Sequence, residues 1–173
     1  MAGLLYRLAL QVYRRLPAGL RRRAVRAMSP SFTVGAMCFI ERPDGALLLV
    51  RHSYRERWGV PGGLLQKGED AEVGPRREVR EEVGLVVELL GEPAVVVDAH
   101  PQRVDVVFRA RPAPGADTEP DVAASAEIVE ARWFAPDALP ELQFETAGAL
   151  VALARIATSA GQRPLPEPVW PRF

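Results

Sequence analysis

Three glutamates have a spacing that suits metal-ion chemistry. Glu78, Glu81 and Glu82 are related as i, i+3 and i+4, so on a helix their carboxylates would share one face. Like charges at that distance repel one another, and a solvated acidic face would normally interleave basic residues at i+4. A hard divalent cation prefers clustered carboxylate oxygens and bridges them to substrate phosphates. The spacing therefore predicts a site for Mg²⁺, with Mn²⁺ as the alternative cation.

The residues around these glutamates follow a fixed order. Five residues separate Gly63 from Glu69, and seven more separate Glu69 from Arg77-Glu78-Val79. One residue then precedes Glu81-Glu82, and one more precedes Gly84-Leu85. At a background frequency of roughly 5–7% per position, chance would supply the seven polar or glycine positions roughly once in 10⁸ starts or fewer. The segment resembles the Nudix box at every defined position.

The resemblance implies a fold and a reaction. The fold class is α/β, a Nudix fold with a mixed β-sheet sandwiched between helices (α/β/α). The reaction is cleavage of a phosphoanhydride bond by attack of water at phosphorus. A bound cation neutralises phosphate oxygens and lowers the pKa of the water, and a glutamate accepts the proton.

Positions within the box acquire roles from the same resemblance. Glu78, Glu81 and Glu82 would be metal ligands and catalytic groups. Arg77 would pair with acidic groups, among them Glu69 in the loop before the helix. Because a planar guanidinium can hold a carboxylate through two hydrogen bonds, Arg77 would orient the ligands.

A later glutamate is a further candidate. Glu127 precedes the apolar run 128–134, which resembles the later Nudix strand whose leading glutamate often completes the metal site. A surface acid on a strand is an equal alternative. The proton acceptor is therefore either a glutamate of the box or Glu127.

The loop ahead of the box contains candidates for substrate binding. Gly62 and Gly63 follow Pro61 and allow the backbone to pass close to a phosphate chain. Trp58 either stacks on a nucleobase or closes the loop over the core. Arg51 is a candidate phosphate ligand. It belongs to a polar cluster that could contact phosphates or ribose but is expected to be mostly solvated: Arg51, His52, Tyr54, Arg55 and Arg57.

The expected substrate is a nucleoside diphosphate linked to another moiety, either ADP-ribose-like or a nucleotide sugar. Pro101 lies 16 residues after Leu85, which resembles the ADP-ribose-cleaving subgroup. The alternatives are a (d)NTP pyrophosphohydrolase and a non-catalytic regulator that binds a nucleotide metabolite. The complete set of box acids argues against the regulator.

Turn signals and hydrophobic periodicity place these residues on elements. Strands 31–41 and 46–51 should form a hairpin around a Pro-Asp-Gly turn. The box helix should start or bend at Gly74-Pro75 and end at Gly84. Further strands are expected at 85–99, 103–110 and 128–134. An Ala/Leu helix at 144–159 is expected to pack on the sheet.

Composition divides the chain into three parts. Residues 1–30 carry seven arginines and no acid, and form a basic extension of two helices, the first with an apolar stripe of Leu4, Leu5, Leu8, Val12 and Leu16. Residues 31–160 form the Nudix domain. Residues 161–173 contain four prolines and form an extended tail.

The net charge of the whole chain is zero, although residues 31–173 contain 15 basic against 22 acidic residues. We therefore expect a nucleotide-type small-molecule substrate and no stable nucleic-acid partner. The basic helices could pack on the acidic domain or a dimer partner, or could bind anionic lipid. Packing is favoured, so membrane association is not expected, and the family makes a homodimer an expectation.

Hydrophobic segments and the single cysteine bear on the cellular location of the protein. No apolar stretch reaches the ~20 residues of a membrane span, and no secretory signal is visible, so a cytoplasmic location is expected. The single cysteine, Cys38, lies in an apolar run and is predicted to be a buried core thiol.

Overall fold

The computed structural model describes residues 2–123 and 125–172, and its side-chain description excludes Ala2, Leu4, Leu5 and Leu8. Most of the apolar stripe predicted for the first helix therefore lies outside the described side chains. The chain forms two compact units, Met1–Phe32 and Thr33–Phe173.

Two helices make up the first unit. α1 spans Ala2–Arg15 and α2 spans Ala18–Met28, so both predicted helices are confirmed. The break falls at Pro17, which precedes α2 with φ −56° and ψ 150°; α1 cannot continue through a residue that lacks the backbone N–H. No helix within the described part of the chain is long and apolar enough to cross a membrane.

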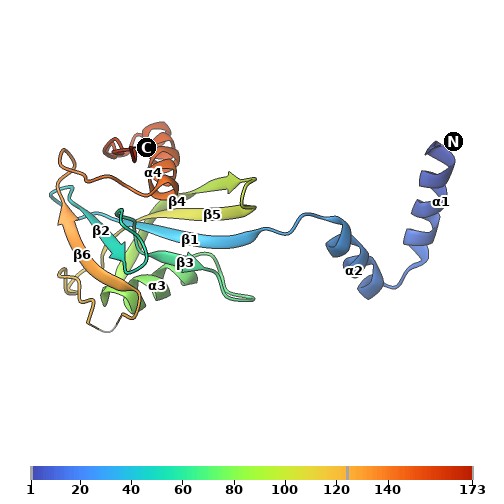
Figure 1. The fold of residues 1–173 in the computed structure, drawn as a ribbon, viewed down its shortest axis with the longest axis horizontal. Coiled ribbons are helices and arrows are strands. Elements are labelled where there is room, and N and C mark those ends of the chain that lie inside the picture. Colours follow the sequence, from blue (N-terminus) through green and yellow to red (C-terminus); the bar gives the residue numbers. More distant parts are fainter. Residues whose placement is uncertain (1, 124, 173) are drawn as a thin grey trace. The chain divides into compact units, whose positions relative to one another are not determined.

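The second unit is built around a four-stranded sheet (Figure 1). β1 runs parallel to β5 and antiparallel to β3, and β4 runs antiparallel to β5. The sheet is therefore mixed, as predicted. Its strand order is β3-β1-β5-β4, made by β1 (Thr33–Ile40), β3 (Gly62–Leu64), β4 (Val87–Asp98) and β5 (Arg103–Pro112).

A separate antiparallel sheet pairs β2 (Leu47–His52) with β6 (Ile128–Phe134). The predicted hairpin between β1 and β2 is wrong in its pairing. The turn at residues 42–45 forms, but β1 and β2 belong to different sheets and an isolated bridge between Glu41 and Leu47 joins their ends. Because β3 and β5 already occupy both edges of β1, β2 pairs with β6 instead.

Two helices cover opposite faces of these strands (Figure 1). α4 (Phe144–Ser159) packs against β4 and β5, and α3 (Val73–Val83) packs against β1 and β3. Side chains alternate along β1: Phe39 belongs to the apolar cluster that contains α4, whereas Cys38 and Ile40 belong to the cluster that contains α3. The predicted arrangement of a mixed sheet between helices is confirmed.

Cys38 lies on the α3 side of the core. Its side chain is fully buried, and this burial raises the pKa of the thiol to about 12. Since the thiolate is the nucleophilic form, Cys38 is an inert core thiol, as predicted.

The ends of α3 follow from three residues. Pro75 lies in the first turn, where no intrahelical bond from its nitrogen is needed. A Cβ on Gly74 would lie 2.3 Å from a methyl carbon of Leu65, so glycine allows the start of the helix to pack closely on the preceding loop. Gly84 ends the helix in the left-handed conformation, with φ 70°. The predicted start near Gly74-Pro75 and end at Gly84 are confirmed.

The segment after α4 returns to the domain through charged groups. Arg109 on β5 donates two hydrogen bonds to the Glu41 carboxylate, at 2.9 and 2.6 Å, and both side chains are buried. Arg109 also donates to the Arg163 carbonyl at 3.1 Å, and the Arg163 guanidinium lies 3.4 Å from Glu41. This cluster joins the C-terminal segment to β1 and β5.

Candidate active site

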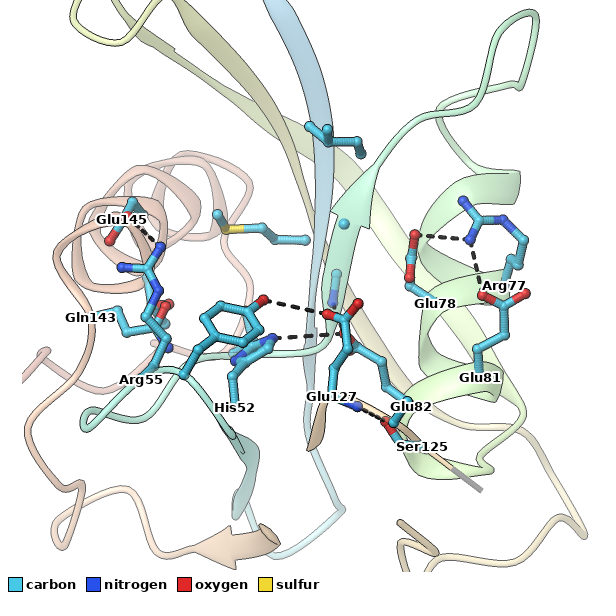
Figure 2. Close-up of a pocket in the computed structure, with 18 of the residues that line it drawn as sticks. His52, Arg55, Arg77, Glu78, Glu81, Glu82, Ser125, Glu127, Gln143 and Glu145 are labelled. Atoms are coloured by element: carbon cyan, nitrogen blue, oxygen red, sulfur yellow. Dashed lines mark hydrogen bonds and ion pairs between the residues drawn. The ribbon is translucent and has the colours of Figure 1, made fainter. Parts of the chain in front are cut away.

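A cavity of about 690 Å³ opens between α3 and the start of α4 (Figure 2). Its wall includes parts of α3 and β3, the loop after β2, the residues before β6 and the first turn of α4. The volume is within the range of small-molecule sites. The charged side chains on the wall are Arg55, Arg77, Glu78, Glu81, Glu82, Arg103, Glu127 and Glu145.

The three glutamates of α3 reach this cavity with different surroundings. Glu82 is only 7% exposed, and its carboxylate accepts a hydrogen bond from the Gly62 N–H at 3.1 Å. His52 Nε2 lies 3.8 Å from the same carboxylate. The Glu78 side chain is largely buried, whereas that of Glu81 is exposed. The i, i+3, i+4 spacing thus brings all three to one cavity, as the helical geometry requires.

The two glycines before the helix allow a close approach of strand and helix. A Cβ on Gly63 would lie 2.5 Å from Glu78 Oε1, and a Cβ on Gly62 would lie 2.3 Å from the Ala36 carbonyl oxygen. Real Cβ atoms essentially never approach so closely. Glycine at position 62 therefore lets β3 pass close to the backbone of β1, and glycine at position 63 lets it pass directly beside the Glu78 carboxylate.

Arg77 joins the acidic groups around the helix. It donates from Nε and Nη2 to the two oxygens of Glu69, at 2.8 and 3.0 Å. Its Nη1 donates to Glu78 at 2.8 Å and to Glu81 at 3.1 Å. The two-point contact with Glu69 fixes the guanidinium plane, so Arg77 holds Glu78 and Glu81 beside the cavity.

The arginine and the crowded carboxylates shift pKa values in opposite directions. Hydrogen bonds from Arg77 and from the Gln66 backbone lower the pKa of Glu69 to about 2. Burial raises the pKa of Glu78 and the charges of Glu82 and Glu81 add to the rise, while Arg77 opposes it. Negative charge at Glu78 is thus only partly compensated within the protein.

The Glu69–Arg77 pair should make the free energy of unfolding depend on pH in the acid range. The pKa of Glu69 is about 2 in the folded chain against an ordinary value of 4.5, so the folded state binds fewer protons. The stabilisation is complete above pH 4.5 and is lost as the pH falls towards 2. Urea unfolding at pH 7 and pH 3 should show a smaller loss of unfolding free energy for Glu69→Gln than for the wild type. Equal losses in both proteins would remove this pair as the cause.

Glu127 comes to the same cavity from a distant part of the sequence. Its carbonyl accepts a hydrogen bond from the Ser53 N–H at 2.8 Å, which joins the segment before β6 to the end of β2. The Tyr54 hydroxyl donates to the Glu127 carboxylate at 3.4 Å. Figure 2 shows the Glu127 side chain in the pocket that Glu82 also lines.

The comparisons with known proteins agree with this geometry. A family model described as the NUDIX domain matches residues 31–154. The chain belongs to the Nudix family. It is 33% identical over 116 residues to a MutT-like protein of Streptomyces ambofaciens, covering 67% of this chain and 72% of that protein. It is 32% identical over 127 residues to the human 8-oxo-dGDP phosphatase NUDT18, covering 72% of this chain and 38% of the human protein.

A solved Nudix structure shares the fold. The ADP-ribose pyrophosphatase of Streptococcus suis superposes with a TM-score of 0.61 at 23% identity, covering 80% of this chain and 98% of that one. The predicted Nudix fold is therefore confirmed, and so is the predicted enzyme class, a Nudix pyrophosphohydrolase.

The structure places most of the predicted Nudix site residues on one cavity, but two of the predicted substrate ligands lie elsewhere. Arg51 is not on the cavity wall; its guanidinium donates to Glu130 at 3.0 and 2.7 Å across the β2–β6 pair. Trp58 is not on the wall either, and packs edge-on against Phe134 with ring centroids 4.9 Å apart. The residues brought together are Gly62, Gly63, Arg77, Glu78, Glu81, Glu82 and Glu127.

Gln143 and Glu145 of the Nudix cavity were not singled out from the sequence, whereas His52, Tyr54 and Arg55 belong to the polar cluster recognised around Arg51. Arg55 pairs with Glu145 at 3.6 Å across the side opposite α3, where Gln143 also lies (Figure 2). His52 and Tyr54 were expected to be solvated, but His52 is buried and its Nδ1 has no hydrogen-bond partner among the described residues. For Gln143 and Glu145, the sequence signal that could have indicated a site is the group of polar residues at 143–146, at the start of an otherwise Ala/Leu helix.

The chemistry of the donor set fits a divalent cation. Five carboxylates line the cavity, those of Glu78, Glu81, Glu82, Glu127 and Glu145, and hard oxygen donors are what Mg²⁺ and Mn²⁺ bind. Within the described residues, no three acidic, histidine or cysteine side chains are already gathered around one point. Arg77 holds one oxygen each of Glu78 and Glu81, which leaves the second oxygen of each carboxylate for a cation.

Proposed function

We propose that this enzyme is a Mg²⁺-dependent hydrolase that cleaves the phosphoanhydride bond of a nucleoside diphosphate linked to another moiety, such as ADP-ribose or a nucleotide sugar. The observation that supports it is the convergence of Glu78, Glu81, Glu82 and Glu127 on one cavity of about 690 Å³. Two of these carboxylates, Glu82 and Glu127, come from segments 45 residues apart.

The metal would be held by the carboxylates of α3, with Glu127 as a further ligand or neighbour. When bound, Mg²⁺ neutralises phosphate oxygens and lowers the pKa of a coordinated water. Mn²⁺ has the same preference for oxygen ligands and is the alternative cation. Arg77 would act as a positioning residue, since it contacts Glu69, Glu78 and Glu81 rather than the cavity centre.

Glu127 is the carboxylate best placed to accept the proton of the attacking water. Glu78 and Glu81 accept hydrogen bonds from Arg77, and Glu82 accepts one from the Gly62 backbone. Glu127, in contrast, contacts the Tyr54 hydroxyl at 3.4 Å, a weak interaction by length. Its side chain therefore has free lone pairs at the cavity, and a general base must reach the water that it deprotonates.

Arg55 is the proposed phosphate ligand on the opposite side of the cavity. Its guanidinium is about half exposed and lies 3.6 Å from Glu145, so an incoming phosphate can displace this contact. Arg103, by comparison, is already held by Asp105 at 2.8 Å. A phosphate group would match the planar fork of the Arg55 guanidinium.

A second candidate function rests on the curated relatives. The human relative is named for phosphatase activity on 8-oxo-dGDP, a free nucleoside diphosphate, and the other relative is described as MutT-like. A (d)NTP or nucleoside diphosphate hydrolase is therefore the alternative. A nucleotide-binding regulator without turnover is disfavoured by the complete set of carboxylates on the cavity.

The proposal is tested by a substrate screen with the purified full chain. ADP-ribose, nucleotide sugars, NADH, dinucleoside polyphosphates, (d)NTPs and 8-oxo-dGDP should each be incubated with Mg²⁺, with Mn²⁺ and with EDTA. We expect hydrolysis of the linked nucleoside diphosphates that EDTA abolishes, and products from ¹⁸O-labelled water would identify the phosphorus attacked. Turnover of (d)NTPs or 8-oxo-dGDP alone would favour the second candidate, and binding without any turnover would show a regulator.

A further inference from the structure

Within the first unit, the two helices do not bury the described apolar side chains against each other. No described side chain among residues 3–32 is buried. Helices of 14 and 11 residues are marginal in isolation, because most helical stability in proteins comes from packing of an apolar face. The large apolar side chains with at least a third of their surface exposed are Tyr6, Leu10, Val12, Tyr13, Leu20, Val25, Met28 and Phe32.

These side chains are arranged in stripes. Tyr6, Leu10 and Tyr13 are related as i, i+4 and i+7 along α1, so they share one face of the helix. On α2, Leu20 and Met28 are two turns apart on one face, with alanines between them. Each helix therefore presents an apolar stripe, and Tyr6 and Met28 are 67% and 87% exposed.

The charged residues of the same unit are all cationic. Residues 1–32 contain seven arginines and no acidic residue. Arg7 and Arg14, seven residues apart on α1, lie on a different face from the tyrosines, and α2 carries Arg22 and Arg26 one turn apart. Any surface that covers this unit must therefore accept both apolar side chains and a net charge of +7.

We propose that residues 3–32 bind an anionic lipid surface, with both helices lying in the plane of the interface. An amphipathic helix with arginines on its polar face and Leu or aromatic residues on the other inserts its apolar stripe at the headgroup boundary. The arginines are attracted to anionic headgroups. Nucleic acid would neutralise the arginines but would leave the apolar stripes exposed. This inference does not depend on the substrate, and it takes anionic lipid as the alternative to packing on protein.

Flotation of the full chain with lipid vesicles tests the proposal. We expect binding to vesicles of phosphatidylcholine with phosphatidylglycerol at low salt, and little binding to phosphatidylcholine alone. Each basic residue at such a surface contributes about fivefold to binding. The triple variant Arg7→Gln, Arg14→Gln, Arg15→Gln should therefore lower the partition coefficient about a hundredfold. The double variant Tyr6→Ser, Leu10→Ser should also weaken binding, because it removes two of the three side chains of the exposed Tyr6, Leu10 and Tyr13 stripe.

A matched control distinguishes the loss of an arginine in the first unit from the loss of an arginine elsewhere in the chain. Arg111 lies on β5 and pairs with Glu88 at 2.8 Å, so Arg111→Gln should bind vesicles as the wild type does. Circular dichroism with vesicles checks that the variants are helical. Absence of wild-type binding to the anionic vesicles at low salt would overturn the proposal and indicate burial against protein. Full binding by the Tyr6, Leu10 variant would overturn it too, because the exposed Tyr6, Leu10 and Tyr13 stripe would then contribute nothing to binding.

Discussion

Replacing Glu82 by glutamine is expected to lower kcat by about 10³-fold or more at saturating Mg²⁺. Metal-ion catalysis supplies several kcal/mol of transition-state stabilisation, and each 1.36 kcal/mol is about tenfold in rate. Glutamine retains the volume and the oxygen that accepts the Gly62 hydrogen bond at 3.1 Å. The substitution therefore removes the charge of the most buried carboxylate in the cavity and leaves the packing of α3 unchanged. Steady-state kinetics with the substrate found by the screen measures the effect.

Glu72→Gln is the matched control for this substitution. Glu72 immediately precedes α3, pairs with Arg76 at 3.7 Å in solvent and is not on the cavity wall. An exposed ion pair of this kind contributes little to stability, so the control should keep nearly all of its activity. A folded Glu82→Gln enzyme that hydrolyses substrate at the wild-type rate would contradict the proposed metal mechanism.

Replacing Glu127 by glutamine is expected to lower kcat by about 10²- to 10⁴-fold, the usual contribution of a general base. The amide can still accept a hydrogen bond from Tyr54, but it cannot take a proton from water. The Mg²⁺ concentration at half-maximal rate should stay close to that of the wild type, because the ligands on α3 are intact. Titration of the rate with Mg²⁺ for both proteins provides this comparison.

Two outcomes would count against the base assignment. A large increase in the Mg²⁺ midpoint would make Glu127 a metal ligand, and an unchanged kcat would remove it from the mechanism. Glu119→Gln is the control, since Glu119 lies on the same long connection, is exposed and contacts Arg42 at 3.8 Å. Its activity should match that of the wild type.

Local signals in the sequence predicted the elements of the fold well. The end of α3 at Gly84 depends on a residue that favours positive φ, and its start depends on Pro75, so both can be recognised without tertiary information. Strand pairing could not be predicted in this way. The turn at residues 42–45 has hairpin chemistry, but both edges of β1 are occupied by β3 and β5, which come from later parts of the sequence.

The candidate site likewise has residues that local spacing predicts and residues that only the tertiary structure brings together. The spacing of Glu78, Glu81 and Glu82 placed three carboxylates on one helical face, and the structure brings Glu127 to the same cavity from a separate segment. Arg51 has the right chemistry for a phosphate ligand, but its cross-strand partner Glu130 holds it away. The type of a residue shows which ligands it can bind. Its partner on the neighbouring strand depends on the register of the two strands, and this register cannot be read from a single sequence.

The pairing of β1 has a consequence for synthesis on the ribosome. Its parallel partner β5 begins at Arg103, and the buried charge of Glu41 is neutralised by Arg109 and approached by Arg163. The central strand thus emerges long before the residues that complete its edges and its charge. Such contacts between distant residues slow folding and prolong exposure of apolar strands. We therefore expect the nascent domain to become stable only after the segment that follows α4 has left the exit tunnel.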